Sequence, residues 1–153
     1  MTLSEPTNSM HLNREGGAEA RLRRSALSIV LWILQVLLAL LFIWAGGFKL
    51  VASAEKLAGP PGSVVLPILF VRFIGVAELL GGIGLILPGL LRIKPGLTPL
   101  AAAGLVIIMI GAVVVTLMGG GGAGLAVFPA VVGLLAAFIA YGRSRLAPIR
   151  PRA

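Results

Sequence analysis

The feature that most constrains the fold is a stretch of 48 residues without a charge, which lies between Lys94 and Arg143. As a single helix this stretch would be about 72 Å long, more than twice the ~30 Å hydrocarbon core of a bilayer. The chain must therefore turn back within it. Four consecutive glycines at residues 119–122 supply the break, because glycine disfavours helix. We predict two membrane spans here, at residues 99–118 and 123–141.

Two further apolar runs precede this stretch. Residues 25–48 carry no charge, and these 24 residues are enough to cross the bilayer as a helix. Residues 64–90 form the next span, after a loop over residues 49–62 in which we expect a short helical piece. Only 12% of the residues are charged, against about a quarter in soluble domains, so a water-soluble fold is excluded. The sequence predicts an all-α fold, an integral membrane four-helix bundle.

Composition divides the chain into three segments. Residues 1–24 are polar and lack an apolar period, so we expect a disordered cytoplasmic tail. Residues 25–142 make up the four-span membrane domain. Residues 143–153 contain four arginines and are expected to form a basic cytoplasmic tail.

The basic residues indicate an orientation. Ten of the thirteen fall on one side of a four-span layout, two (Lys49 and Lys56) fall on the other, and Arg72 lies inside the second span. Cytoplasmic flanks of membrane spans are rich in Lys and Arg, so both termini are expected in the cytoplasm and the chain in the inner (plasma) membrane. Because the charges sit in short clusters between spans, the net charge of +8 does not indicate a nucleic-acid partner. The ten are Arg14, Arg21, Arg23, Arg24, Arg92, Lys94, Arg143, Arg145, Arg150 and Arg152.

The sequence lacks the residues that disulfide, thiolate and metal chemistry require. There is no cysteine, which excludes disulfides and thiolate ligands within the chain. The single histidine, His11, lies in the polar N-terminal segment with no second metal ligand nearby, so no metal site is predicted. No nucleophile–base pair stands out, and the sequence leaves open whether the protein is an enzyme.

An acid lies inside the second span. A carboxylate in hydrocarbon is costly unless it is paired, neutralised or hydrated, so Glu78 marks a site or a specified helix contact. Gly75, Glu78 and Gly82 share one helical stripe, which indicates that Glu78 faces the bundle. Gln35 of the first span is expected at a similar depth and is the candidate partner. A second pair of small residues for helix packing is Ala77 and Gly81.

A second group of candidate site residues is expected in the outer half of the membrane. The rise per residue puts Trp44, Lys49, Arg72 and Thr116 at matching depths. If their side chains converge, the cluster can hold a carbonyl, an anionic headgroup or a partner's carboxylate. If they do not, Arg72 extends to the interface as an anchor. With Glu78 and Gln35, these four residues complete the predicted ligand-binding set.

Five segments resemble the DoxX-like family of small four-span bacterial membrane proteins. The similarity extends over about residues 27–145, and the Glu-Leu-Leu-Gly-Gly block is the most specific part. The segments are Arg72-Phe73-Ile74-Gly75-Val76-Ala77-Glu78-Leu79-Leu80-Gly81-Gly82, Leu87-Pro88-Gly89, Leu97-Thr98-Pro99-Leu100-Ala101-Ala102, Ala45-Gly46-Gly47-Phe48-Lys49-Leu50 and Ala140-Tyr141-Gly142-Arg143.

The resemblance implies a fold and a link to quinones. The family takes its name from a subunit of a thiosulfate:quinone oxidoreductase, and relatives are associated with membrane redox systems. Its recurring polar positions correspond to Lys49, Arg72 and Glu78. Thr116 stands where relatives carry a histidine, so the resemblance brings no catalytic role with it.

Three functions remain open from the sequence. The first is a non-catalytic subunit that anchors or assembles a membrane-associated complex, with a membrane protein or a second copy of the chain as partner. The second is a quinone- or lipid-binding redox component that uses the buried carboxylic acid of Glu78. The third is a small-solute carrier. The lipid bilayer is a partner in all three.

Overall fold

The computed structural model describes residues 7–58, 63–91, 94 and 96–147, and these ranges contain helices and no strand. Four of the helices are long and apolar enough to cross a membrane, which confirms the predicted fold class. In chain order the elements are α1 (Thr7–Val51), α2 (Ala54–Leu57), α3 (Ile68–Leu91), α4 (Leu97–Met118), α5 (Gly122–Tyr141) and the π-helical turn η1 (Gly142–Leu146).

The glycine run ends one helix and begins the next, as predicted. The α4 helix ends at Met118, and α5 begins at Gly122. Gly120 and Gly122 have φ values of 73° and 69°, which glycine adopts without the steric cost that a side chain would bring. Pro88, which the sequence puts near the end of its span, lies inside α3, and the helix continues to Leu91.

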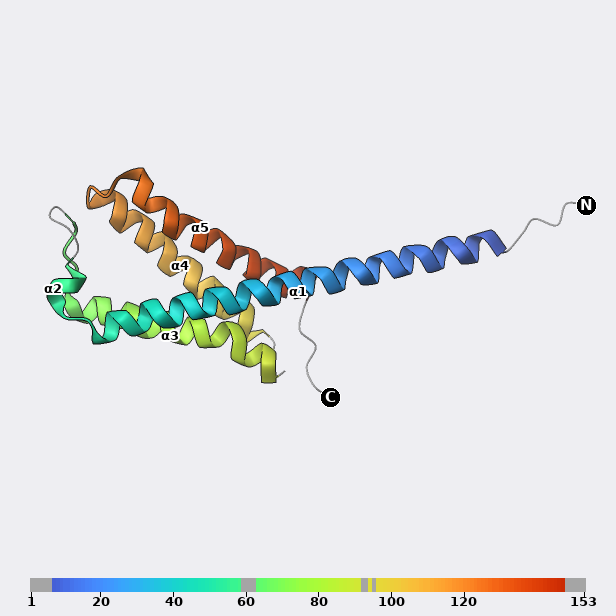
Figure 1. Ribbon diagram of the computed structural model, residues 1–153, viewed down its shortest axis with the longest axis horizontal. Helices are drawn as coiled ribbons and strands as arrows, with labels where there is room; N and C mark the ends of the chain where they lie inside the picture. Colours follow the sequence, from blue (N-terminus) through green and yellow to red (C-terminus); the bar gives the residue numbers. More distant parts are fainter. Residues whose placement is uncertain (1–6, 59–62, 92–93, 95, 148–153) are drawn as a thin grey trace, which may run out of the picture.

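The first helix is longer than the sequence predicted. Residues 7–24 were expected to be disordered, but they continue α1 toward the N-terminus. A membrane span supplies the helical nucleus, so adding residues to its end costs little. The segment before the span, Glu-Ala-Arg-Leu-Arg-Arg at residues 19–24, consists of good helix formers. In Figure 1 this part of α1 projects beyond the other helices.

The helices pack as two hairpins that meet at one end. Helix α3 contacts both α1 and α4, and α4 contacts α5. Figure 1 shows α1 and α5 converging at the end where η1 lies and separating toward the other. We call the first the terminal end and the second, which carries α2 and the glycine turn, the loop end. Fully buried side chains of the core include Leu31, Phe42, Leu85, Leu105 and Ile139.

Candidate functional site

Close packing of α1 on α3 buries the stripe that carries Glu78. A Cβ built on Gly46 would lie 2.5 Å from the Gly75 carbonyl oxygen, so the two backbones approach more closely than side chains permit. Gly82 packs in the same way against the Ala39 carbonyl. Small residues at such contacts let helices associate in lipid, where hydrophobic burial does not drive them together. The predicted packing role of this stripe agrees with these contacts, and Glu78 faces α1.

The partner of Glu78 is Lys49, near the C-terminal end of α1. The Lys49 Nζ lies 2.7 Å from one carboxylate oxygen and 3.0 Å from the other. Glu78 is 3% exposed, whereas the Lys49 side chain is 28% exposed. Helical side chains tilt toward their own N-terminus, so in this antiparallel pair the two side chains lean toward each other. The candidate pairing of Glu78 with Gln35 was wrong.

Arg72 binds the end of α1. One of its terminal nitrogens, Nη1, donates to the carbonyl of Leu50. This carbonyl belongs to the last turn of the helix, where backbone oxygens have no partner within the helix and carry partial negative charge. Lys49 and Arg72 therefore both attach α3 to the loop end of α1, by an ion pair and by a cap.

Trp44 and Thr116 do not join these groups. The Trp44 side chain is 70% exposed and stacks on Phe48, with ring centroids 6.0 Å apart. The Thr116 hydroxyl donates to the Ala112 carbonyl of its own helix at 2.8 Å. Equal depth did not bring the four residues together, because depth along a helix does not determine the direction in which a side chain points. The predicted four-residue cluster reduces to the contacts of Lys49 and Arg72.

A second polar cluster lies at the terminal end, around Arg143 of η1. Its Nε donates to the Gln35 side-chain oxygen at 2.6 Å, and its Nη1 lies 3.3 Å from the Ser28 hydroxyl. The guanidinium carbon is 5.2 Å from the centre of the Trp32 ring, within the range of a cation–π contact. Arg143 is 4% exposed and packs within the helical bundle, whereas the sequence led us to expect it at the start of a basic cytoplasmic tail.

Gln35 extends this cluster to α3. Its side-chain nitrogen donates to the Leu85 carbonyl. Pro88 lies three residues further along α3 and has no N–H, so the helix lacks the bond that residue 88 would give to the Gly84 carbonyl, one residue before Leu85. The Gln35 amide therefore links α3 through its nitrogen and η1 through its oxygen, and it holds three parts of the chain together.

Sequence reasoning missed Arg143 because its position resembles that of an ordinary flanking arginine. Gly142 permits the burial: a Cβ there would lie 2.7 Å from a methyl carbon of Leu31, so the turn packs directly on α1. One signal was present in the sequence. Gln35 and Ser28 are seven residues apart in an otherwise apolar run and share one helix face, which calls for a polar partner.

The second small-residue pair of α3 lies nearer α4. A Cβ on Gly81 would lie 2.6 Å from a methyl carbon of Leu105, and one on Gly84 would lie 2.8 Å from Ala101 Cβ. Ala77 is half-buried on the same helix. Glycines on two faces of α3 thus let it pack between α1 and α4, which makes it the central helix of the bundle.

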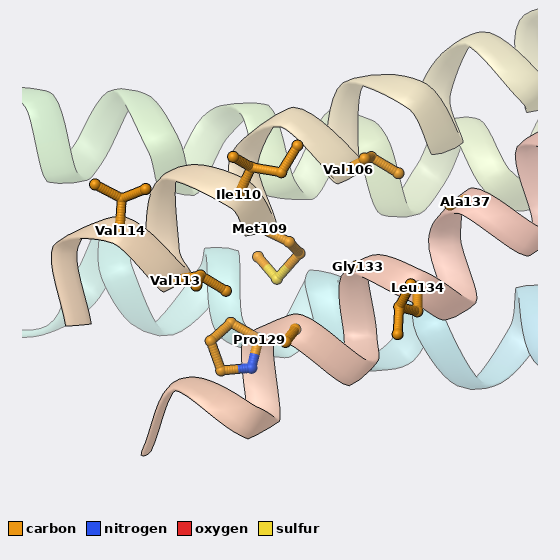
Figure 2. A pocket seen from close by; sticks show the side chains of 10 residues that line it. Val106, Met109, Ile110, Val113, Val114, Pro129, Gly133, Leu134 and Ala137 are labelled. Atoms are coloured by element: carbon orange, nitrogen blue, oxygen red, sulfur yellow. The ribbon is translucent and has the colours of Figure 1, made fainter. Parts of the chain in front are cut away.

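A groove of about 400 Å³ lies between α4 and α5, and none of the predicted site residues lines it. Figure 2 shows Met109 and Val113 of α4 facing Pro129 and Gly133 of α5 across it. Its lining is apolar throughout and includes Leu134, which is exposed. Such a surface accepts an acyl chain, an isoprenoid tail or an apolar helix.

The geometry indicates what the polar groups do chemically. Both oxygens of Glu78 accept from Lys49, and Gln35 uses both ends of its amide. Among the described residues, no three His, Cys, Asp or Glu side chains lie close enough to hold a metal ion. The polar contacts hold α1, α3 and η1 in a fixed register.

Comparison with known proteins identifies the family. The model of the DoxX-like family matches residues 33–139, which include Lys49, Arg72, Glu78 and the α3 glycines. Searches of curated proteins and of solved structures found no match. With the four predicted spans present and more than half of the chain matched, the protein belongs to the DoxX-like family.

Proposed function

We propose that this protein is a small multi-pass subunit that anchors or assembles a membrane-associated complex in the plasma (inner) membrane. The observation that carries the proposal is that Lys49 and the buried Glu78 form an ion pair between α1 and α3. A charge pair used in this way specifies which helices meet and in which register. Breaking the Lys49–Glu78 pair would therefore disturb the packing of the helices, which is a structural effect rather than a catalytic one.

The outer surface of the bundle supports the proposal. In the most apolar part of α4 only 17% of the residues are buried within the chain. Ile107 and Ile110 of that helix are 71% and 60% exposed. Together with the groove between α4 and α5, this face offers an apolar surface of uneven shape against which a partner's helix can pack. The opposite hairpin, which carries the ion pair, keeps the register of the bundle.

A second candidate function is a quinone- or lipid-binding redox component. The groove favours it, because an isoprenoid tail requires a long apolar surface that opens to lipid. The groove's lining offers no polar group for the quinone carbonyls. An anchoring subunit could also bind an isoprenoid tail in this groove. We therefore keep the subunit role as the proposal.

Photo-crosslinking in the native membrane tests the proposal. A photoreactive residue at Ile110 or Leu134 should trap one protein at a fixed ratio to the chain, measured by native mass spectrometry of the purified complex. The matched control is the same residue at Leu80, which is 65% exposed but lies on α3. It should trap that protein less. A chain purified alone, with quinone in its organic extract, would instead support the second function.

A further inference from the structure

Among the residues that the structure describes, no opposite charge contacts the buried guanidinium of Arg143. Its partners are an amide, a hydroxyl, a carbonyl and the Trp32 ring, all of them neutral. Its Nη2 is fully buried and has no hydrogen-bond partner in the described part of the chain. A buried cation whose neighbours are only neutral dipoles is costly, so the arrangement calls for an anion.

Further basic residues lie next to this group. Arg21 and Arg24 of α1 are exposed, and they precede Ser28 by seven and four residues. By the 3.6-residue period they share the α1 face that binds Arg143. Arg145 of η1 is exposed close by in sequence. In Figure 1, α1 projects beyond the point where α5 and η1 meet it.

The carboxylates that the structure describes do not balance this charge. Of the three glutamates whose side chains the structure describes, Glu55 lies in α2 at the loop end and Glu78 is bound to Lys49. Glu19 lies near Arg21 in sequence, but a separation of two residues turns it by about 200° around the helix. It therefore points away from the basic face.

We propose that the junction of α1 and η1 is a binding site for a phosphate group, and that the headgroup of an anionic phospholipid supplies it. Arg21 and Arg24 hold the phosphate from α1, and the buried guanidinium of Arg143 adds its positive charge beneath the site, at the end of the fourth span. Basic pockets between membrane helices on the cytoplasmic side bind such headgroups, and the charge bias predicts that side here. The α1 extension beyond the bundle thereby gains a role, since it carries two of the basic residues of the site.

Lipid retention tests the proposal. The full chain is reconstituted in phosphatidylcholine nanodiscs with and without phosphatidylglycerol, and bound lipids are counted by native mass spectrometry. Wild-type protein should retain one phosphatidylglycerol in preference to phosphatidylcholine. One basic contact is worth roughly fivefold in affinity, so Arg24→Gln should weaken retention by about that factor. The double variant Arg21→Gln/Arg24→Gln should weaken it by roughly 25-fold.

Arg23→Gln is the matched control. Arg23 is exposed and carries the same charge, but it lies about 140° around the helix from Ser28. Its replacement should leave retention within about twofold of wild type. Equal effects of Arg23→Gln and Arg24→Gln, or equal retention of both lipids, would overturn the site. Because Arg21, Arg23 and Arg24 are exposed, these replacements should leave the fold intact, and the test does not depend on changing the buried Arg143.

A second experiment tests whether a lipid headgroup or a free anion supplies the phosphate. Inorganic phosphate is added to nanodiscs of phosphatidylcholine alone, and the thermal midpoint is measured. Stabilisation that matches phosphatidylglycerol and is lost in Arg24→Gln would support the phosphate site with a free anion as its ligand. Stabilisation by phosphatidylglycerol alone would support the lipid headgroup.

Discussion

Replacing Lys49 by methionine removes the cation of the ion pair and keeps most of the side-chain volume. Glu78, at 3% exposure, is then left in the bundle without its partner. Removing one member of a buried pair costs about 3–5 kcal/mol, and we expect about 3 kcal/mol because Lys49 is partly exposed. Glu78→Leu leaves a lysine that can reach the headgroups, and should cost about 1–2 kcal/mol. Glu78→Gln, which keeps a hydrogen-bond acceptor, should cost less than Glu78→Leu.

The double variant separates charge pairing from packing. With both charges replaced by apolar side chains, the desolvation cost disappears together with the attraction. The stability of Lys49→Met/Glu78→Leu should therefore lie within about 1 kcal/mol of wild type. These values give a coupling energy of at least about 3 kcal/mol between the two positions.

Unfolding in mixed micelles of mild detergent and sodium dodecyl sulfate measures these free energies. The fluorescence of Trp32 and Trp44 and the far-ultraviolet circular dichroism should report the same transition in wild type and all variants. Additive single-variant effects, with a coupling energy below about 0.5 kcal/mol, would contradict the pairing. The Lys49–Glu78 contact would then be incidental to the fold.

Three further predictions follow from the fold. Reporter fusions just after Lys94 should read cytoplasmic and fusions at Gly121 external; a cytoplasmic signal at Gly121 would refute the four-span orientation. Gly46→Ala should destabilise the protein by about 2 kcal/mol or more in the same unfolding assay, since its Cβ would meet the α3 backbone, whereas Gly47→Ala, with nothing within 4 Å, should be neutral or stabilising. Arg72→Gln should cost about 1 kcal/mol through loss of a charged cap on α1, and Arg72→Lys should recover part of it; silence of both variants would show that the cap is not needed.

The sequence alone determined how many times the chain crosses the membrane. The uncharged lengths, the glycine run and the positions of the basic residues depend on distance along the chain and on the thickness of the bilayer, so no tertiary contact is needed to derive them. The direction of Glu78 was also predictable, because Gly75 and Gly82 share its face and only a closely packed neighbour makes use of them.

The partner of each polar group was decided only by the tertiary structure. Depth suggested Gln35 for Glu78, but the register of α1 on α3 brings Gln35 to Leu85 and leaves Glu78 to Lys49. The same tilt toward the helix N-terminus that points Arg72 outward points Lys49 inward, so the pair was within reach of the sequence once the helices were known to be antiparallel neighbours.

Arg143 illustrates the limit most clearly. In sequence it is one of ten basic residues on the side predicted to be cytoplasmic, and neither its charge nor its distance from the span separates it clearly from Arg145. Its burial depends on Gly142 packing against Leu31 and on Gln35 and Ser28 facing the same turn from more than a hundred residues away. Composition and spacing report depth in the membrane, whereas rotation about each helix axis is determined by the packing of all the helices together.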